Sequence, residues 1–530
     1  MSISAPFLLF LPGLLVALAW ASPACLPSPV LQLSLGSCSV LSPGQPDVHS
    51  WGVLLGIDRA DSLCAAPSTV LSNSFLTTDD LCTGSQLVDI QGLRLTDAQC
   101  RSRRGGYITQ ARPLPEAPTD GLAAANPNWI ALGNNITSAA VATLRFLDQS
   151  VTMTVGLIRS GQQSTASHLG LDAGSVLLRS LKDKSLIAAR SFGLNVGSQS
   201  AEFPRRGSLV LGGYDQASFA SSSVAEYPIS TAKLNNRHCP LQVQVEKLTL
   251  SARRSPNSTD TEDREIWGQA NPVTFCIEPY DNLFRLPNNT ILQVTEFFKA
   301  RTGYSGTPVP TSDYQDKLAN LEPGLVYPRS AASAFNGSMR LTLKDGFTVD
   351  IPVHEMQRPL RGLDSNGQVV VDNDYTEIQI YGKEAPGLAP VLGKTFLSQV
   401  YLYVDYDAGI FRLAPQALEV TTPVPVSSAS CATILSPSDK GLIGVGSVVG
   451  ALLLCLLAYA TYRFRRSKAT SKESLGPANE PGNEVVRDEN LVTGPGGTIE
   501  PPDDTDGSTR SPIPDIERPD AVNDHRRWVH

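Results

Sequence analysis

The sequence predicts an all-β fold for the central part of the chain, followed by one transmembrane helix and a disordered tail. Between Cys25 and Pro415, apolar residues alternate with polar ones in short runs bounded by turn residues, for example over 151–158 and 347–351. This alternation is typical of half-buried strands. At 530 residues, 41% of them hydrophobic, the chain is long enough to bury a large core.

The N-terminus has the features of a secretory signal. An apolar run covers 7–20 and ends in Ala19-Trp20-Ala21, which is a small-x-small cleavage site. We therefore expect 1–21 to be a signal peptide. The following residues, 22–50, form a cysteine-containing N-terminal segment.

A second apolar run, 441–462, holds 22 residues without a charge, which is close to the ~20 residues that cross a bilayer. Arg463, Arg465, Arg466 and Lys468 follow it, and such a cluster predicts a cytoplasmic end. We expect a juxtamembrane linker at 421–440 and a single span at 441–462. A buried core helix is the alternative for this run.

The segment 463–530 is predicted to be a disordered cytoplasmic tail. From Ala469 onward it has 13 acidic and 6 basic residues, so it carries −7 of the chain's formal charge of −8. Such a composition buries too little apolar surface to offset the entropy of ordering. A docking or phosphorylation segment around Ser511 and a solvated tail without a specific partner are both open interpretations.

Glycosylation signals and cysteines agree with an ectodomain that lies outside the cell or in the secretory pathway, at the plasma membrane or another membrane of that pathway. The Asn-x-Ser/Thr acceptors all precede the predicted span, and they are Asn135, Asn257, Asn288 and Asn336. Eight of nine cysteines also precede it, and these disulfide candidates are Cys25, Cys38, Cys64, Cys82, Cys100, Cys239, Cys276 and Cys431. An even number suits an oxidising compartment. Their connectivity is open, with Cys239–Cys276 the preferred pair in the second half.

Several other kinds of site find no support. The six histidines are scattered without a metal-binding spacing, so we expect no metal. G-x-S-x-G, P-loop and dinucleotide motifs are absent, so no cofactor is expected. No basic patch suggests nucleic acid, and the oligomeric state is not specified by the sequence. The run Arg101-Ser-Arg-Arg104 fits either a processing signal or a structural turn, and we favour the turn.

Four landmarks in order give the stretch from about Trp51 to Pro415 a family resemblance. They are His168-Leu-Gly-Leu-Asp-Ala-Gly-Ser175, Gly207-Ser-Leu-Val-Leu-Gly-Gly-Tyr-Asp215, Val391-Leu392-Gly393, and the closing strands from Phe396 to Leu413-Ala414-Pro415. Together they resemble the pepsin-like aspartic proteases, in particular their fungal membrane-anchored branch. The resemblance implies a bilobal all-β fold, with a first lobe at 51–220, a second lobe at 221–420 and a peptide-sized cleft between them.

The same resemblance locates two catalytic positions, and both are altered. No Asp-Thr-Gly or Asp-Ser-Gly tripeptide occurs in the chain. Counting from Leu55-Gly56 places the first loop at Pro67-Ser68-Thr69-Val70, where proline supplies no carboxylate. Cys82-Thr83-Gly84-Ser85 copies the motif with Cys in place of Asp, but its spacing is too long. Counting back from Leu286-Pro287 places the second loop at Glu278-Pro279-Tyr280-Asp281.

These substitutions predict a protein that has lost proteolysis. Hydrolysis of this type needs two carboxylates that share a proton across one water molecule, and Glu278 alone cannot serve both roles. We therefore expect an inactive, membrane-anchored protein that binds a peptide, protein or cell-wall ligand in its cleft. One alternative is an atypical aspartic endopeptidase in which Asp58, Asp61 or Asp79 joins Glu278. A purely structural surface glycoprotein is another.

Overall fold

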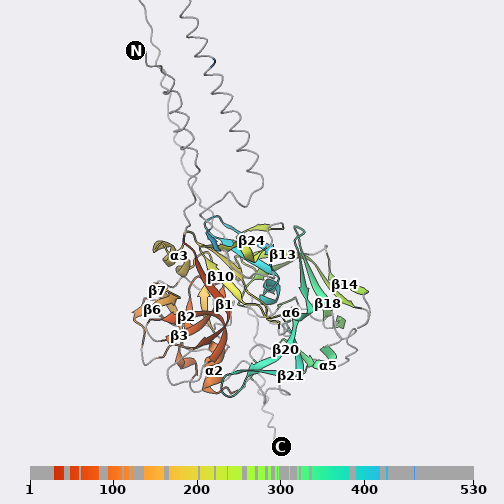
Figure 1. Cartoon of the computed structure of the whole chain (residues 1–530), viewed down its shortest axis with the longest axis horizontal. Coiled ribbons are helices and arrows are strands. Elements are labelled where there is room, and N and C mark those ends of the chain that lie inside the picture. The colour runs from red at the N-terminus through yellow and green to blue at the C-terminus, as the bar shows by residue number, and fades with distance from the viewer. Residues whose placement is uncertain are drawn as a thin grey trace, which may run out of the picture. The chain divides into compact units, whose positions relative to one another are not determined.

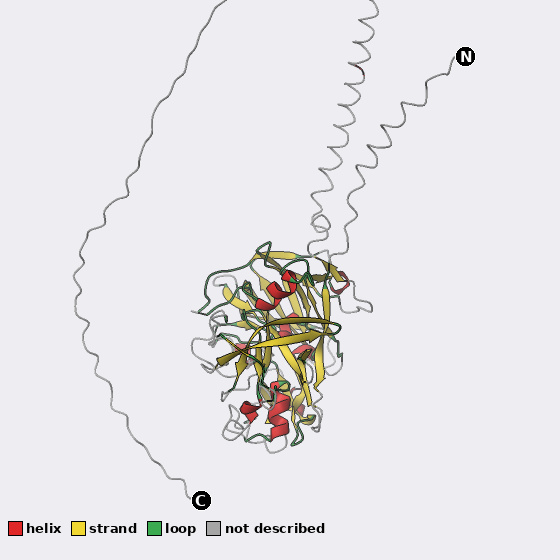
Figure 2. Ribbon diagram, turned by 90° about the vertical axis from the view of Figure 1, so that its left-hand side faces the viewer, coloured by secondary structure: helices red, strands yellow, loops and turns green. Residues whose placement is uncertain are grey.

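The computed structural model is built mostly of strands, with a few short helices (Figures 1 and 2). The chain divides into two units, 1–440 and 441–530. The residues described are 29–40, 48–58, 61–82, 94–109, 113–118, 122, 136–159, 166–200, 203–219, 223–235, 237–253, 260–268, 272–280, 284–287, 293–294, 296–297, 309–310, 319–320, 324–332, 337–380, 389–417, 425–427 and 459.

The all-β character predicted for the central part is confirmed, and the predicted fold class needs one correction. No helix among the described residues is both long and apolar enough to cross a membrane. The range in which a transmembrane helix was expected, 441–462, lies outside the described residues except for Tyr459. The described residues also leave out the expected signal peptide at 1–21 and the expected tail at 463–530. Of the expected linker at 421–440, they include only 425–427.

The largest sheet has 13 strands in the order β12-β24-β23-β9-β10-β1-β2-β3-β8-β4-β7-β6-β5. Their bounds are β1 Leu31–Val40, β2 Val48–Ile57, β3 Asp61–Ser68, β4 Phe75–Thr77, β5 Glu116–Ala117, β6 Ile136–Phe146, β7 Gln149–Ile158, β8 Ser167–Gly170, β9 Ser191–Asn195, β10 Gly207–Leu211, β12 Ala225–Pro228, β23 Val400–Asp405 and β24 Ile410–Pro415. The N-terminal segment 22–50 thus contributes β1 and the start of β2 to this sheet.

Six neighbouring strands of this sheet join the two halves of the chain. Strands β9, β10 and β1 come from the first half, and β12, β24 and β23 come from the second. All neighbours among the six are antiparallel, and the halves meet where β23 pairs with β9, Leu402 lying opposite Leu194. Three strands from each half therefore form one continuous antiparallel layer.

The second half adds sheets of its own, seen on the right of Figure 1. A six-stranded sheet has the order β19-β18-β13-β15-β22 with β14 paired to β13, and a four-stranded sheet has the order β16-β20-β21-β17. The bounds are β13 Gln242–Arg253, β14 Thr261–Trp267, β15 Val273–Ile277, β16 Ala319–Asn320, β17 Leu325–Pro328, β18 Gly337–Leu343, β19 Thr348–Pro352, β20 Gln357–Leu363, β21 Val369–Ile378 and β22 Val391–Leu392. A two-stranded sheet pairs β11 Gly213–Asp215 with β25 Pro425–Ser427.

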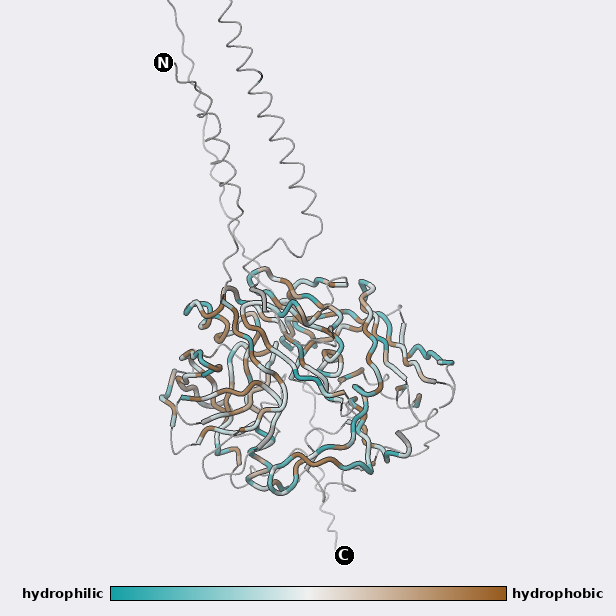
Figure 3. Tube along the Cα trace, in the orientation of Figure 1, coloured by the Kyte–Doolittle hydropathy of each residue, from teal (hydrophilic) through white to brown (hydrophobic). Residues whose placement is uncertain are grey.

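Alternation along the strands explains the core. In β7, Val151, Met153 and Val155 are buried, whereas Thr152 and Thr154 are not. Successive side chains of a strand point to opposite faces, so this order turns one face of the sheet toward the interior. Figure 3 shows hydrophobic segments following the strands of the compact unit.

The helices are short. They are η1 Asp79–Cys82, α2 Asp97–Arg104, α3 Val176–Asp183, η4 Gln216–Ser218, α5 Arg329–Ala332, α6 Val353–Met356 and α7 Lys394–Leu397. Helix α2 begins with a capping box at Thr96 and ends at Gly105 in the left-handed region. Arg101, Arg103 and Arg104 are buried within it. The arginine run therefore belongs to a structural element.

Helix α2 is held against the second half of the chain by the hairpin of β20 and β21. Thr96 Oγ1 donates to Ser365 O over 2.8 Å, and Ser102 Oγ donates to Gly367 O over 2.5 Å. Figure 1 shows the same hairpin running beside α2. Two elements more than 250 residues apart are therefore fixed to each other.

Three disulfides lie in the described part of the chain: Cys38–Cys64, Cys82–Cys100 and Cys239–Cys276. The preferred second-half pair, Cys239–Cys276, is confirmed. The other two candidates, Cys25 and Cys431, lie outside the described residues, as do all four predicted glycosylation acceptors.

Candidate functional site

Two similar loops meet at the junction of the halves. Strand β3 ends at Ser68 and pairs in parallel with β8, Ser68 lying opposite Gly170. Strand β15 ends at Ile277 and pairs in parallel with β22, Ile277 lying opposite Leu392. Each half therefore delivers a loop from the end of one strand in a parallel pair.

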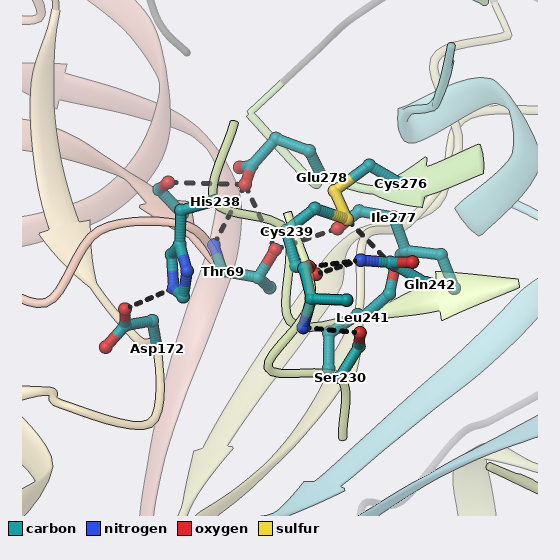
Figure 4. Close-up of a disulfide and its surroundings, with 12 residues drawn as sticks. Thr69, Asp172, Ser230, His238, Cys239, Leu241, Gln242, Cys276, Ile277 and Glu278 are labelled. Atoms are coloured by element: carbon teal, nitrogen blue, oxygen red, sulfur yellow. Dashed lines mark hydrogen bonds and ion pairs between the residues drawn. A yellow bond between two sulfur atoms is a disulfide. The ribbon is translucent and has the colours of Figure 1, made fainter. Parts of the chain in front are cut away.

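Glu278 lies where these loops touch, and its carboxylate receives hydrogen bonds from both of them. Figure 4 shows the bonds from the loop after β3. Oε2 accepts from the Thr69 backbone N–H over 3.0 Å, from Thr69 Oγ1 over 3.0 Å and from Ser68 Oγ over 3.3 Å. Oε1 accepts from the Tyr280 backbone N–H over 3.0 Å. Thr69 Oγ1 also lies 2.8 Å from Ile277 O, so its one hydroxyl hydrogen is shared between Ile277 O and Oε2, and it ties the loop after β3 to the end of β15.

The environment of Glu278 favours its neutral form. The residue is only 1% exposed. Burial raises the pKa of its carboxyl to about 7, while the hydrogen bonds from Tyr280, Thr69 and Ser68 act in the opposite direction. In mildly acidic solution Glu278 is therefore protonated and cannot act as a general base.

A buried histidine completes the inner wall of the site. His168 in β8 is fully buried, and its ring meets the edge of Tyr280 with centroids 4.4 Å apart. Neither ring nitrogen has a hydrogen-bond partner among the described residues. Burial, together with the positive charge of Lys394, lowers the pKa of His168 to about 3. His168 is therefore neutral at ordinary pH.

A second histidine braces the loop that follows β8. His238 Nε2 lies 2.8 Å from Asp172 Oδ2, as Figure 4 shows beside Glu278. Asp172 also accepts hydrogen bonds from Ser72 Oγ and from the Gly174 backbone N–H. The Asp172 carboxylate is therefore committed to holding the loop.

The carboxylates considered as partners for Glu278 lie elsewhere. Asp61 is the first residue of β3 and Ser68 is the last, so the two are separated by roughly 23 Å of extended strand. Asp58, just after β2, accepts from the Thr143 backbone N–H over 3.3 Å. Asp79 begins η1 near Tyr107, whose pKa is raised mainly by burial and by the charge of Asp97, with a smaller contribution from Asp79.

The structure unites most of the candidate residues named from the sequence. Ser68, Thr69, Glu278 and Tyr280 lie together, and Asp281 lies outside the described residues. Pro67, the predicted first catalytic position, is buried in β3 opposite Leu169. The residue that faces Glu278 is Ser68, because a strand's side chains alternate between its faces.

Sequence reasoning missed His168 and Lys394 as neighbours of the site. A cavity of about 730 Å³ opens beside Tyr280 and is lined in part by Trp51 and Lys394. The Lys394 Nζ lies 3.5 Å from the centroid of the Trp51 ring, within the range of a cation–π contact. No group of three His, Cys, Asp or Glu side chains among the described residues could hold a metal ion.

Comparison with known proteins adds no assignment. No protein-family model matches the chain, and no curated protein matches it.

Proposed function

We propose that this protein is a non-proteolytic binding protein built on a bilobal, pepsin-like framework. The observation that carries the proposal is the pairing of Ser68 with Glu278 where two carboxylates would be required. Serine supplies a hydroxyl in place of the second carboxylate, so Ser68 and Glu278 do not form a pair of acids that shares a proton across a water molecule.

The protonation of Glu278 supports the same proposal. A catalytic acid–base pair needs one carboxylate ionised to activate water and one protonated to assist the carbonyl oxygen. Burial keeps Glu278 protonated up to a pKa of about 7, and both of its oxygens already accept hydrogen bonds from the loops. This carboxyl acts as a link between the halves.

The arrangement of strands supports a two-lobed framework. Each half contributes three strands to the joining layer and one parallel pair that ends at the site. The cavity beside Tyr280 provides room for a ligand. Three disulfides support residence in an oxidising compartment.

A hydrolysis assay tests the proposal. The full chain is incubated with a mixed peptide library across the acid and neutral pH range, and products are identified by mass spectrometry. The matched control is Glu278→Gln prepared identically, so that a contaminating protease is recognised. We expect no cleavage that distinguishes the two preparations.

One result would overturn the proposal in favour of an atypical aspartic endopeptidase. That result is acid-dependent cleavage that the aspartic-protease inhibitor pepstatin blocks and that disappears in Glu278→Gln.

A further inference from the structure

The cavity beside Tyr280 is lined by an excess of positive charge. Six cationic side chains contribute to its wall, and none of its lining residues is acidic. These cations come from α2, from the segment before β10, from β20 and from the start of α7, and they are Arg103, Arg205, Arg206, Arg358, Arg361 and Lys394. We call this cavity the basic pocket.

Buried carboxylates behind the wall neutralise only part of this charge. Arg205 forms an ion pair with Glu355 over 3.5 Å, and Arg358 forms one with Glu377 over 2.9 Å. These two glutamates are 1% and 0% exposed at their side chains. They therefore fix their arginines in place and are themselves out of reach of a ligand.

Two further arginines keep their binding capacity. Neither Arg206 nor Arg361 forms an ion pair with a carboxylate of the described residues. Arg206 is exposed and Arg361 is half-buried. Burial lowers the pKa of Arg361 and the neighbouring Arg358 lowers it further, while the negative charge of Glu377 acts in the opposite direction. An anion that enters the pocket relieves the repulsion between Arg358 and Arg361, and it accepts two parallel hydrogen bonds from the N–H groups of a guanidinium.

The rest of the wall is apolar or carries serine hydroxyls, which both donate and accept hydrogen bonds. Trp51, Tyr280 and Val369 contribute apolar surface, and Val369 is 46% exposed. The amide oxygen of Gln199 already accepts from Arg358 over 2.6 Å. A neutral sugar brings no negative charge to the six cations of the wall. Carboxylates carried on a chain with apolar side chains match the wall better.

We propose that the basic pocket binds an acidic peptide segment, whose carboxylates are received by Arg206 and Arg361 and whose apolar side chains lie on Trp51 and Val369. The proposal rests on the binding function proposed above and names its ligand class. A volume of about 730 Å³ falls in the range of pockets that enclose small ligands, so it accommodates a few residues of such a segment.

Fluorescence anisotropy with the full chain tests this proposal. The probe is a labelled octapeptide library in which every member carries three Asp or Glu residues. A second library replaces these residues by Asn and Gln, and a third probe is a sulfated oligosaccharide. We expect the acidic library alone to bind, and its affinity to fall as salt is raised because charge carries the recognition.

Variants locate the binding. Arg361→Gln is expected to weaken binding of the acidic library about tenfold or more, since hydrogen bonds to charged groups are among the strongest. Arg206→Gln serves as a second variant. Because the Arg206 side chain is exposed, this change leaves the fold intact. The matched control is Arg264→Gln, an exposed arginine of β14 that does not line the pocket. It removes the same charge and should leave affinity unchanged.

Several results would overturn the proposal: no binding of the acidic library, equal binding of the neutral library, preference for the sulfated oligosaccharide, or equal losses in Arg361→Gln and Arg264→Gln. None of these bears on proteolysis, which the hydrolysis assay measures separately. A chain that cleaves peptides defeats the proposed function, whereas a non-cleaving chain that ignores acidic peptides defeats only the ligand class.

Discussion

Ser68 donates its hydroxyl hydrogen to Glu278 over 3.3 Å and so links two loops that are 210 residues apart in the sequence. Thr69 reinforces the link with its N–H and its hydroxyl, both donated to the same carboxyl oxygen. A buried carboxyl that is satisfied from the opposite half of the chain holds the two halves together. Its protonation state therefore affects the stability of the whole junction.

Glu278→Gln is expected to remove a pH dependence of unfolding. The pKa of Glu278 rises from 4.5 to about 7 on folding, so its stabilising contribution is fully present below pH 4.5 and is lost as pH rises through 7. This shift corresponds to roughly 3 kcal/mol. Urea denaturation across this pH range should show that, as pH rises, the unfolding free energy of the variant increases by that amount relative to the parent. A constant difference would contradict the prediction.

His168→Leu is expected to act with the opposite sign. The pKa of His168 is lowered on folding from 6.5 to about 3, so its contribution is present above pH 6.5 and is lost as pH falls toward 3. The variant should therefore resist acid better than the parent. At neutral pH the free energy of unfolding of the variant should equal or exceed that of the parent, because buried ring nitrogens without hydrogen-bond partners destabilise the folded state.

Thermal unfolding at several pH values measures this effect. His354→Leu, which replaces a partly exposed histidine, controls for the loss of an imidazole. A His168→Leu protein that unfolds more readily in acid than the parent would show that the histidine is charged in the folded state.

Local patterns predicted the parts of the fold that depend on local chemistry. The alternation of Val151, Met153 and Val155 with threonines specified β7, and Ser175 marked the start of α3, where its side chain accepts from the Leu178 N–H. Both features arise within a few residues of sequence. The motif count also singled out Glu278, which lies where the two loops meet.

Features that require distant segments to meet could not be predicted in this way. Which side chain at the end of β3 faces Glu278 depends on the pairing of β3 with β8, about 100 residues later. His168 carries no local signal that it will pack on Tyr280. The arginines of the basic pocket come from separate segments, and each one alone resembles an ordinary surface charge.

Removal of the Cys239–Cys276 disulfide should loosen the surroundings of Glu278. Cys276 lies two residues before Glu278 in β15, and the disulfide joins it to Cys239 across 37 residues. We expect the double change to alanine to cost about 2–4 kcal/mol. Water that reaches Glu278 should also lower its raised pKa, so the pH dependence of unfolding should shrink.

The matched control for that change is the Cys82→Ala, Cys100→Ala double variant, whose disulfide spans 18 residues between η1 and α2. It should lose stability while keeping the full pH dependence. Equal pH profiles in the two double variants would show that Cys239–Cys276 does not shield Glu278.

Gly170→Ala should disturb the junction by displacing backbone. A Cβ atom at Gly170 would lie 2.5 Å from Asn73 O and 2.8 Å from Leu71 O, and neither backbone oxygen can turn aside as a flexible side chain does. We expect a loss of about 1–3 kcal/mol in unfolding free energy. Because Gly170 lies opposite Ser68, the pH dependence of unfolding that stems from Glu278 should weaken too.

Gly56→Ala is the control. The nearest neighbour of a Cβ atom at Gly56 is a side-chain atom of Arg145, at 3.3 Å, so urea denaturation should show a smaller loss of unfolding free energy for this variant. A Gly170→Ala protein as stable as Gly56→Ala would mean that the close approach at β8 is not required.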